Sequence, residues 1–453
     1  MKKILYRSTN RKARYVDFKE AVLKGQPADY GLFMPIEFPQ VNQYELNSFK
    51  KKEYYEIAFS ILSKFLSGEI PEEKLYEIVK KSYNFEVPIE KINENLYILY
   101  LDRGPTCSFK DFAGRFMAGV MEYFAKENDL NLIVLVATSG DTGGAIANAF
   151  YNKENIKVVI LFPKDEITEI QRKQMTTLNR NVISVALNGK FDDCQNLVKR
   201  AFNDADLKNM NLTSANSINI SRLLPQSVYY FYAYSRLDFK KLIFSVPSGN
   251  FGNLMGGVIA KKMGLPVEKF IVAVNENDEF PKFLKTGKYK PVIPSKKCNS
   301  NAMNVGHPSN LARLIDLYGG WIYDERDDSG RVIRYGVIKE QPDMEKLRKD
   351  FISFSITDEE VEKAIKEYYV KYKIILDPHG AVAVCAYEKS SMKEPVVSIE
   401  TANPGKFPEI IKKILGFEPE IPESLRILIS KDENYFILEN DYGKFKEFLM
   451  ELR

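Results

Sequence analysis

The chain of 453 residues changes its hydrophobic pattern near residue 131. Before that point, apolar positions recur at the three-to-four-residue spacing of an amphipathic helix. After it, short continuous apolar runs alternate with helical stretches, as in parallel sheets that are covered on both faces. The pattern predicts a mostly helical region over residues 1–100 and doubly wound α/β structure beyond it. We divide the latter into a small α/β domain over 101–240 and a large α/β domain with C-terminal elements over 241–453.

The periodicity also predicts individual elements. Helices are expected over 54–66, 73–82, 142–151, 166–178, 191–205, 217–237, 254–263, 357–372 and 408–415. Strands are expected over 132–137, 157–162, 182–187, 242–246, 270–274 and 396–400. Residues 29–39 and 278–320 have the composition of irregular loops, 323–339 is charged and turn-rich, and the chain should end in a strand and a helix.

The stretch 101–116, LDRGPTCSFKDFAGRF, contains the first candidate for chemistry, Lys110. The apolar residues around it have helical spacing: Phe109, Phe112, Ala113, Phe116, Met117, Val120, Met121 and Phe124. Lys110 therefore stands at the mouth of an amphipathic helix, where an apolar environment would lower its pKa and leave an amine able to attack an aldehyde. The alternative is a solvated lysine beside a core helix, which is the commoner state of lysine.

Composition restricts the classes of partner. The formal net charge is +4, with 28% charged and 45% hydrophobic residues, and the basic residues are spread along the chain. Nucleic-acid binding therefore gains no support. No apolar run is long enough for a signal peptide or a membrane span. The cysteines (Cys107, Cys194, Cys298 and Cys385) are far apart and form no CxxC pair, so we expect free thiols and a cytoplasmic location.

The only two histidines of the sequence are His307 and His379. A zinc site or a Ser-His-Asp triad would have to use one of them. His379 stands in DPHGAVAV, just before an apolar run, and we interpret it as a loop or helix-capping histidine. We therefore predict no metal site.

Two strand-to-helix loops can bind anions. In 138–144, TSGDTGG, small residues and the hydroxyls of Ser139 and Thr142 lie where a helix begins. An ordinary turn with Asp141 or Thr142 as N-cap is an equal alternative. In 248–253, SGNFGN, two glycines allow close approach of a phosphate to the backbone, without the third glycine of a dinucleotide site or the Lys-Ser/Thr pair of a Walker loop.

Two further stretches are rich in polar side chains. In 214–222, SANSINISR, Asn219 and Arg222 share a helix face, and the arginine could clamp a second anion; a capped helix start with a surface arginine is the alternative. In 400–407, ETANPGKF, Thr401 follows a strand, where open α/β sheets place ligand contacts. One activated lysine with anion-binding loops and no metal set suggests an enzyme dependent on pyridoxal 5′-phosphate (PLP).

Several long motifs, in this order, resemble the threonine synthase family of fold type II PLP enzymes. They are ADYGLFMPIEFP, GPTCSFKDFAGRFM, ATSGDTGGAIANAFY, QMTTLNRNVISVALNGKFDDCQNLVKRAF, LTSANSINISRLLPQ and VPSGNFGNLMGG. The resemblance covers residues 12–415 and is to the subgroup with an added N-terminal helical region. It implies an α/β fold of two doubly wound open sheets with the cofactor between domains.

The resemblance also implies residue roles. Lys110 would be the catalytic residue, forming a Schiff base with PLP and then moving protons. Gly249, Asn250, Phe251 and Asn253 would hold the cofactor phosphate, and Thr401 would face the pyridine nitrogen. Ser139, Gly140, Asp141 and Thr142 would meet the substrate carboxylate or the cofactor ring oxygen, and Asn216, Ser217 and Arg222, with Arg115 in reserve, would bind the substrate phosphate.

The implied reaction converts O-phospho-L-homoserine and water to L-threonine and phosphate, the last step of threonine biosynthesis, by γ-elimination and β-addition of water. One alternative is a related fold type II lyase, such as a serine/threonine dehydratase or a cysteine synthase-like enzyme. Another is a non-catalytic protein that binds PLP or a phosphoamino acid. We expect a monomer or a homodimer that acts on a small molecule and binds neither nucleic acid nor membrane.

Overall fold

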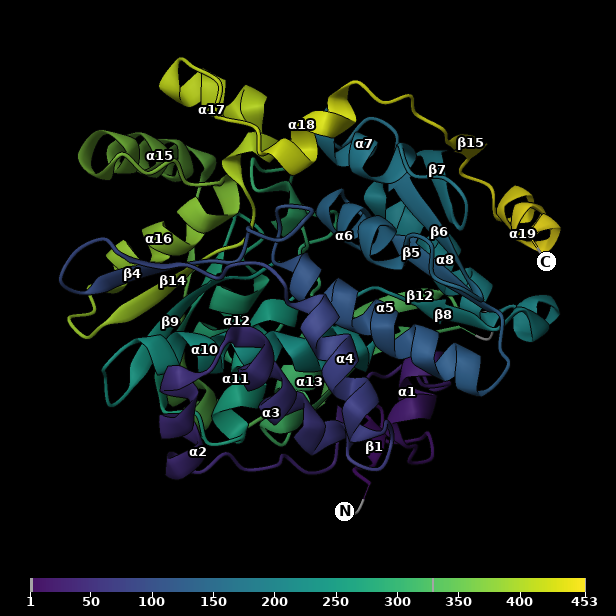
Figure 1. Ribbon diagram of the computed structural model, residues 1–453, viewed down its shortest axis with the longest axis horizontal. Coiled ribbons are helices and arrows are strands. Elements are labelled where there is room, and N and C mark those ends of the chain that lie inside the picture. Colours follow the sequence, from purple (N-terminus) through teal and green to yellow (C-terminus); the bar gives the residue numbers. More distant parts are fainter. Residues whose placement is uncertain (1–2, 328–329, 453) are drawn as a thin grey trace.

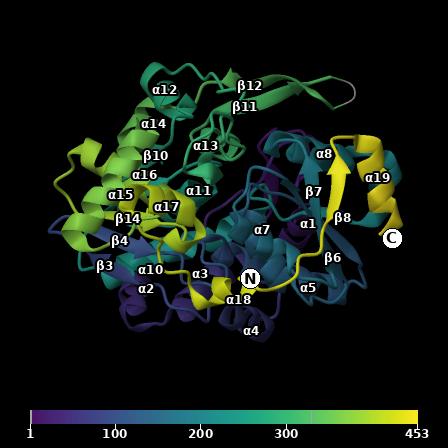
Figure 2. The ribbon, with the colours of Figure 1, turned by 90° about the horizontal axis from the view of Figure 1, so that it is seen from above.

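Two twisted sheets organise the computed structural model, which describes residues 3–327 and 330–452 (Figure 1). One sheet has five strands and the other has six, and they lie on opposite sides of the molecule (Figures 1 and 2). The predicted fold class, two doubly wound sheets with an N-terminal helical region, is confirmed.

The five-stranded sheet has the order β15-β7-β6-β5-β8, and all of its pairs are parallel. Its strands are β5 (Leu132–Ala137), β6 (Ile156–Pro163), β7 (Val182–Asn188), β8 (Leu212–Ser214) and β15 (Phe436–Glu439). Its helices are α5 (Lys110–Glu127), α6 (Asp141–Phe150), α7 (Glu169–Thr176), α8 (Phe191–Asn203) and α19 (Tyr442–Glu451). The sheet thus takes its last strand from the far end of the chain (Figure 2).

Strand β5 shows why its sequence is continuously apolar. Val134 and Val136 belong to the core cluster that includes α5 and α6. Ile133 and Leu135 point to the other face and pack in the cluster of α8 and α19. Since successive side chains of a strand point to opposite faces, a sheet covered on both sides needs apolar residues at every position.

The six-stranded sheet has the order β13-β10-β9-β14-β4-β3 and is parallel except at the β3–β4 edge. Its strands are β3 (Ile89–Lys91), β4 (Leu96–Tyr100), β9 (Leu242–Pro247), β10 (Val267–Val274), β13 (Phe351–Ser355) and β14 (Val396–Glu400). Its helices include α10 (Val228–Arg236), α11 (Gly252–Lys262), α14 (Met344–Asp350), α15 (Asp358–Tyr372), α16 (Pro378–Ser390) and α17 (Pro408–Leu415).

The N-terminal region packs against α5. Its elements are β1 (Tyr6–Ser8), α1 (Phe18–Lys24), β2 (Phe33–Pro35), α2 (Gln43–Ser48), α3 (Tyr54–Leu66) and α4 (Glu72–Ser82). The predicted helices at 54–66 and 73–82 are therefore confirmed, the second starting one residue earlier. Tyr54 of α3 meets Phe112 of α5 with ring centroids 5.2 Å apart, which ties this region to the helix that begins at Lys110.

The predicted single helix over 217–237 is wrong in detail. It begins three residues later, as α9 (Ile220–Leu223), continues as a 3₁₀ turn over Leu224–Ser227 and ends as α10. Asn219 caps α9, because its side chain accepts from the Ser221 N–H. Pro225 lies in the 3₁₀ turn, and proline has no N–H for an α-helical hydrogen bond.

The stretch predicted to be irregular or turn-rich, from 278 to 339, contains regular elements. These are α12 (Glu279–Thr286), a 3₁₀ turn at Asn301–Met303, α13 (Leu311–Leu317), and an antiparallel hairpin of β11 (Trp321–Arg326) and β12 (Val332–Glu340). The hairpin extends from the body of the molecule (Figure 2), and β12 is largely exposed, so it carries no apolar run that a strand prediction could use. The remaining C-terminal helix is α18 (Glu423–Ile429).

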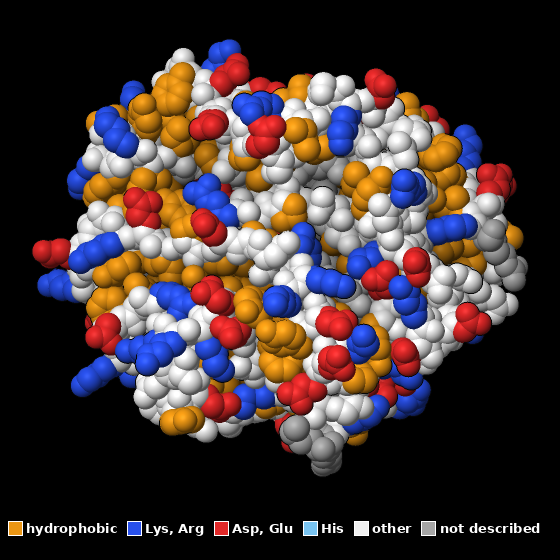
Figure 3. Space-filling model, viewed as in Figure 1, with side chains coloured by type: hydrophobic (Ala, Val, Ile, Leu, Met, Phe, Trp, Pro, Cys, Tyr) orange, Lys and Arg blue, Asp and Glu red, His pale blue; other side chains and the backbone are white. Residues whose placement is uncertain are grey.

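Lysine, arginine, aspartate and glutamate side chains are interspersed on the face of the molecule shown in Figure 3.

Within residues 3–327 and 330–452, the structure contains no helix with the length and apolarity to cross a membrane.

Candidate active site

A cavity lies where β5, β9 and β14 end, and most of the predicted site residues line it. They are Lys110, Ser139, Asp141, Thr142, Asn216, Ser217, Arg222, Gly249, Asn250, Phe251, Asn253 and Thr401. The carboxyl ends of parallel strands and the helix starts that follow them meet there, which is the usual place of ligand sites in open α/β sheets.

Lys110 is the first residue of α5 and projects into this cavity. The Phe109 N–H donates to the Thr401 carbonyl at 2.9 Å, which joins the start of α5 to the end of β14. The Lys110 side chain is only 12% exposed, and its Nζ lies 4.6 Å from the centre of the Phe109 ring. Burial lowers the pKa of Lys110 below 10.5, as the sequence predicts, and positive neighbours lower it further, although Asp141 opposes the shift.

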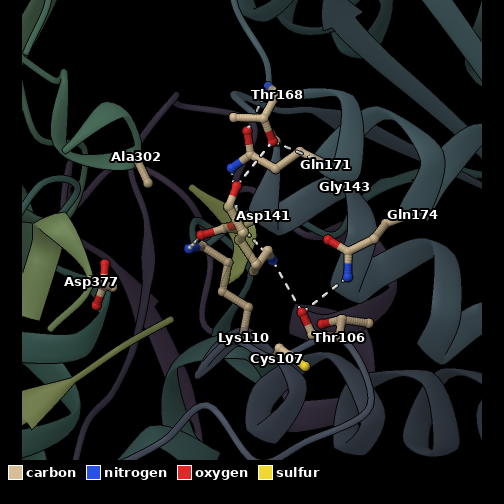
Figure 4. A network of polar contacts seen from close by, with 12 residues as sticks. Thr106, Cys107, Lys110, Asp141, Gly143, Thr168, Gln171, Gln174, Ala302 and Asp377 are labelled. Atoms are coloured by element: carbon tan, nitrogen blue, oxygen red, sulfur yellow. Dashed lines mark hydrogen bonds and ion pairs between the residues drawn. The ribbon is translucent and has the colours of Figure 1, made fainter. Parts of the chain in front are cut away.

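Asp141, the first residue of α6, forms ion pairs with two lysines, Lys406 and Lys110, and Figure 4 shows it beside Lys110. Its Oδ1 is 2.7 Å from Lys406 Nζ, and its Oδ2 is 3.4 Å from Lys110 Nζ. Gln171 Nε2 also donates to Oδ1, at 3.0 Å. Burial alone would raise the pKa of Asp141, but the positive charges of Lys406 and Lys110 hold it well below 3.8.

The loop before α11 has the geometry of an anion site. Phe251 adopts φ 62°, a left-handed conformation, and no side chain caps the helix that follows. Asn253 accepts hydrogen bonds at Oδ1 from Tyr229 and Tyr230, at 2.7 and 2.9 Å, while its buried Nδ2 has no hydrogen-bond partner in the described part of the chain. A buried donor without a partner, beside a helix N-terminus, fits an anionic ligand.

Gly249 and Asn250 hold this loop against the turn at Asn301–Met303. A Cβ on Gly249 would come within 2.8 Å of Met303 Cα and 2.9 Å of the Ala302 carbonyl oxygen. Only glycine permits this close backbone approach. Asn250 Nδ2 donates to Ser217 Oγ at 2.9 Å, which connects the loop to the stretch before α9.

Ser217 and Arg222 line the same cavity from the α9 side. Ser217 Oγ accepts from two amides, those of Asn250 and Asn310, so its hydroxyl hydrogen is free to donate. Arg222 is 3% exposed, and burial lowers its pKa to about 10. Its Nη1 donates to the Ala215 carbonyl at 2.6 Å, but its buried Nε has no hydrogen-bond partner among the described residues. Arg222 is thus not a surface arginine.

Asn216 uses its whole amide on the backbone of β5. Its Nδ2 donates to the Ala137 carbonyl at 2.7 Å, and its Oδ1 accepts from the Ala137 N–H at 3.2 Å. The loop that follows is capped by Thr138, whose hydroxyl accepts from the N–H groups of Gly140 and Gly143. Gly140 lies in this loop at φ 126° and, unlike Ser139 and Thr142, does not line the cavity.

Arg115, the reserve candidate for the substrate phosphate, lies away from the cavity. Its guanidinium donates to the carbonyls of Lys81 and Ser82 and to the side chain of Asn84, at 2.7–2.8 Å. Five helical residues after Lys110 amount to a turn of roughly 140° about the axis of α5, so the two side chains leave on different faces. The structure therefore does not bring Arg115 together with the other candidates.

His379 and Lys406 belong to the site, although their sequence context predicts no such role. His379 is 3% exposed and lines the cavity from the first turn of α16, where Asp377, not His379, is the N-cap. Its Nδ1 is 2.5 Å from Asp377 Oδ1, and its Nε2 accepts from the Ala302 N–H at 3.2 Å. An aspartate before Pro378 is a local signal for the cap, but no local signal places His379 or Lys406 beside Asp141.

The site fits PLP and contains no cluster of metal ligands. A buried lysine faces the cavity, an unpartnered amide lies beside the start of α11, and Gly249 permits close backbone approach. Across the described residues, 3–327 and 330–452, no group of three or more His, Cys, Asp or Glu side chains could hold a metal ion. All four cysteines are free thiols.

Comparison with known protein families identifies the class of enzyme to which the chain belongs. Residues 83–331 match the family described as pyridoxal-phosphate dependent enzyme, so the chain is a fold type II PLP-dependent enzyme, with PLP as its cofactor. Residues 5–83 match the threonine synthase N terminus, and residues 380–449 match the threonine synthase C-terminal family. The chain belongs to the threonine synthase family.

Individual relatives agree over almost the whole chain. Threonine synthase of Haemophilus influenzae is 39% identical over 96% of this chain and 97% of its own, and that of Escherichia coli K12 is 39% identical over 90% and 91%. The PLP-bound threonine synthase structure from Brucella melitensis superposes with a TM-score of 0.90 at 34% identity, covering 99% of both chains. A tomato threonine deaminase, at 17% identity and a TM-score of 0.53, shares the fold alone.

Proposed function

We propose that this chain converts O-phospho-L-homoserine and water to L-threonine and phosphate. The observation that carries the proposal is Arg222, a buried guanidinium in the cavity of Lys110 whose Nε has no hydrogen-bond partner within residues 3–327 and 330–452. Substrates of dehydratases have no phosphate and would leave this cation without use. A phosphorylated amino acid has two anionic ends, and Ser217 with Arg222 would bind the phosphate end. Asn216 supports this position by orienting the adjacent backbone.

The cofactor would be held by three parts of the cavity. Lys110 Nζ would bind it covalently as a Schiff base. Gly249, Asn250, Phe251 and Asn253 would surround its phosphate at the start of α11. The Thr401 hydroxyl would face the pyridine nitrogen, and a hydroxyl rather than a carboxylate there would leave that nitrogen largely unprotonated. When bound, PLP withdraws electrons from the substrate and makes its Cα and Cβ protons acidic.

Lys110 would also move the protons. A lysine amine with a lowered pKa is a competent base near neutral pH. Once the substrate amine has replaced it, Lys110 Nζ would take the proton from the substrate Cα and later return a proton to Cγ. Ser139 and Thr142, with the backbone at Gly140, would hold the substrate carboxylate at the start of α6, and Asp141 would orient Lys110.

The experiment measures phosphate and threonine formed from O-phospho-L-homoserine, with and without added PLP. We expect turnover by the unaltered chain and a loss of roughly 10³-fold or more in Lys110→Ala. Lys126→Ala, an exposed lysine on the same helix, serves as the control. Formation of 2-oxobutanoate from threonine without phosphate release would instead identify a dehydratase, and PLP colour without turnover would identify a binding protein.

Three further predictions accompany this function. We propose a cytoplasmic location, supported by the four free thiols, which cell fractionation would test. We also predict that the protein is a monomer or a homodimer, and light scattering would test this oligomeric state.

The division of the chain into the regions 1–100, 101–240 and 241–453 stays a prediction as well. Limited proteolysis would test these boundaries.

A further inference from the structure

The Asp141 carboxylate is shared unequally between two lysines. Oδ1 receives Lys406 Nζ at 2.7 Å and Gln171 Nε2 at 3.0 Å. Among the residues that the structure describes, Oδ2 receives only Lys110 Nζ, at 3.4 Å, which is long for a charge-assisted hydrogen bond. Lys406 is therefore the closer ion partner of Asp141, and Lys110 is the more distant one.

Lys406 is fixed in this position by its surroundings. It is fully buried, and its Nζ also donates to the Thr106 carbonyl at 3.1 Å. It closes a 3₁₀ turn, Pro404–Lys406, whose Asn403 side chain accepts from the Gly405 N–H and donates to Asp102. It does not line the cavity, whereas Lys110 does. One lysine is thus enclosed with the carboxylate while the other faces the ligand space.

We propose that Lys406 is a positioning residue that takes up the charge of Asp141, so that Lys110 is not held as the ammonium partner of this carboxylate. The proposal rests on the role proposed for Lys110 above. A buried carboxylate with Lys110 as its only cation would favour protonated Lys110, which cannot attack an aldehyde. With Lys406 in place, the Asp141 carboxylate orients Lys110 at a distance of 3.4 Å but does not hold the Lys110 amine in its protonated form.

Other groups around Asp141 and Lys110 also stabilise the charged carboxylate or the neutral amine. Arg222, from α9, adds a positive charge that lowers the pKa of Lys110. His379, from α16, is directed by Asp377 and lies close enough to Asp141 to contribute to the low pKa of that carboxyl. Gln171, from α7, contributes a neutral donor. Lys406 is the closest cation to Asp141 among these groups.

The test is the pH dependence of Lys110 reactivity in the full chain stripped of cofactor. Trace acetic anhydride acetylates only neutral amines, and peptide mass spectrometry reports the acetylated fraction at Lys110. In Lys406→Met we expect the midpoint of this curve to move up by about one pH unit. Below the midpoint, that shift lowers Lys110 reactivity about tenfold. Lys173→Met is the matched control, because Lys173 is a buried lysine that donates to the carbonyls of Ile429 and Lys431.

A second variant keeps the test decisive if Lys406→Met does not fold. Asp141→Asn removes the negative charge that is paired with Lys110 and leaves Lys406, so the midpoint should move down. An unchanged midpoint in a folded Lys406→Met, a shift of the same size in Lys173→Met, or an upward shift in Asp141→Asn would overturn the proposal. The role of Lys110 is tested separately, by adding PLP, reducing with borohydride and mapping the labelled lysine. A label elsewhere would refute that role, whatever the acetylation curves show.

Discussion

The starts of α6 and α11 are two versions of one arrangement. Each helix follows a parallel strand and begins at the cavity, and each is preceded by a residue with positive φ, Gly140 at 126° and Phe251 at 62°. Asp141 stands in the first turn of α6, whereas α11 has no acidic residue there. The Thr138 hydroxyl accepts from two N–H groups at α6, whereas no side chain caps α11.

This difference indicates which of the two helix starts can bind the negative charge of a ligand. A helix N-terminus favours a negative charge nearby. The start of α6 carries its own carboxylate, which is already paired with lysines. Among the described residues, the start of α11 has an unpartnered amide at Asn253 and no acid in its first turn, so we expect an external anion to supply the charge there. Asn253 belongs to the start of α11, and Thr142 and Asp141 belong to the start of α6, whereas Arg115 of α5 belongs to neither.

Asn253→Asp should have the largest effect, because it makes the start of α11 resemble that of α6. Tyr229 and Tyr230 can still donate to a carboxylate, so the fold should survive. The added charge would repel the cofactor phosphate, and PLP affinity should fall about 100-fold. Absorbance titration of the stripped protein with PLP measures this. Asn131→Asp adds the same charge at an exposed position and should leave affinity unchanged; equal affinity in both variants would refute the assignment of α11.

Thr142→Val alters the start of α6 at constant side-chain shape. We expect the KM for O-phospho-L-homoserine to rise about tenfold, because one hydrogen bond to a charged group is lost. PLP affinity should not change, since the cofactor phosphate is assigned to α11. Steady-state kinetics and PLP titration separate the two effects, and Thr286→Val at a surface position is the control. A fall in PLP affinity without a change in KM would reverse the assignments.

Asp141→Asn tests the charge of α6 through acid stability. The pKa of Asp141 is lower in the folded protein than its ordinary 3.8. Its contribution is therefore fully present above pH 3.8 and is lost as the pH falls below that value. In this window the unaltered chain should lose up to about 1.4 kcal/mol per pH unit more than the variant. Urea unfolding at successive pH values measures the difference, and parallel curves would contradict a charged Asp141.

Arg115→Gln should have the smallest effect on function. The variant loses hydrogen bonds from α5 to the end of α4, so the free energy of unfolding should fall by about 1 kcal/mol. PLP affinity and KM should stay at their original values, because Arg115 does not reach the cavity. Urea unfolding and kinetics on one preparation suffice, and an increase in KM would return Arg115 to the substrate site.

The local sequence was enough to predict a helix or strand where the environment of that element is uniform. The run LIVLVA is apolar at every position because β5 is buried on both faces, and this makes it recognisable as a strand. The capping box of Thr357 and Glu360 marks the start of α15 correctly, since both partners are close in sequence. The β11–β12 hairpin was missed because exposed strands need no apolar residues.

The amino-acid sequence alone was enough to predict the doubly wound class, the loops with glycine and hydroxyl groups, and Lys110 as the candidate amine. Which cations surround Lys110 became clear only from the three-dimensional arrangement of the chain. Arg115 and Lys110 are on one helix but leave it on different faces, while Lys406, 296 residues further along the chain, meets Asp141 at 2.7 Å. Electrostatic interactions depend on distance and burial in space, and the β14–β4 pairing brings the segments that carry Lys406 and Lys110 together although they are far apart in sequence.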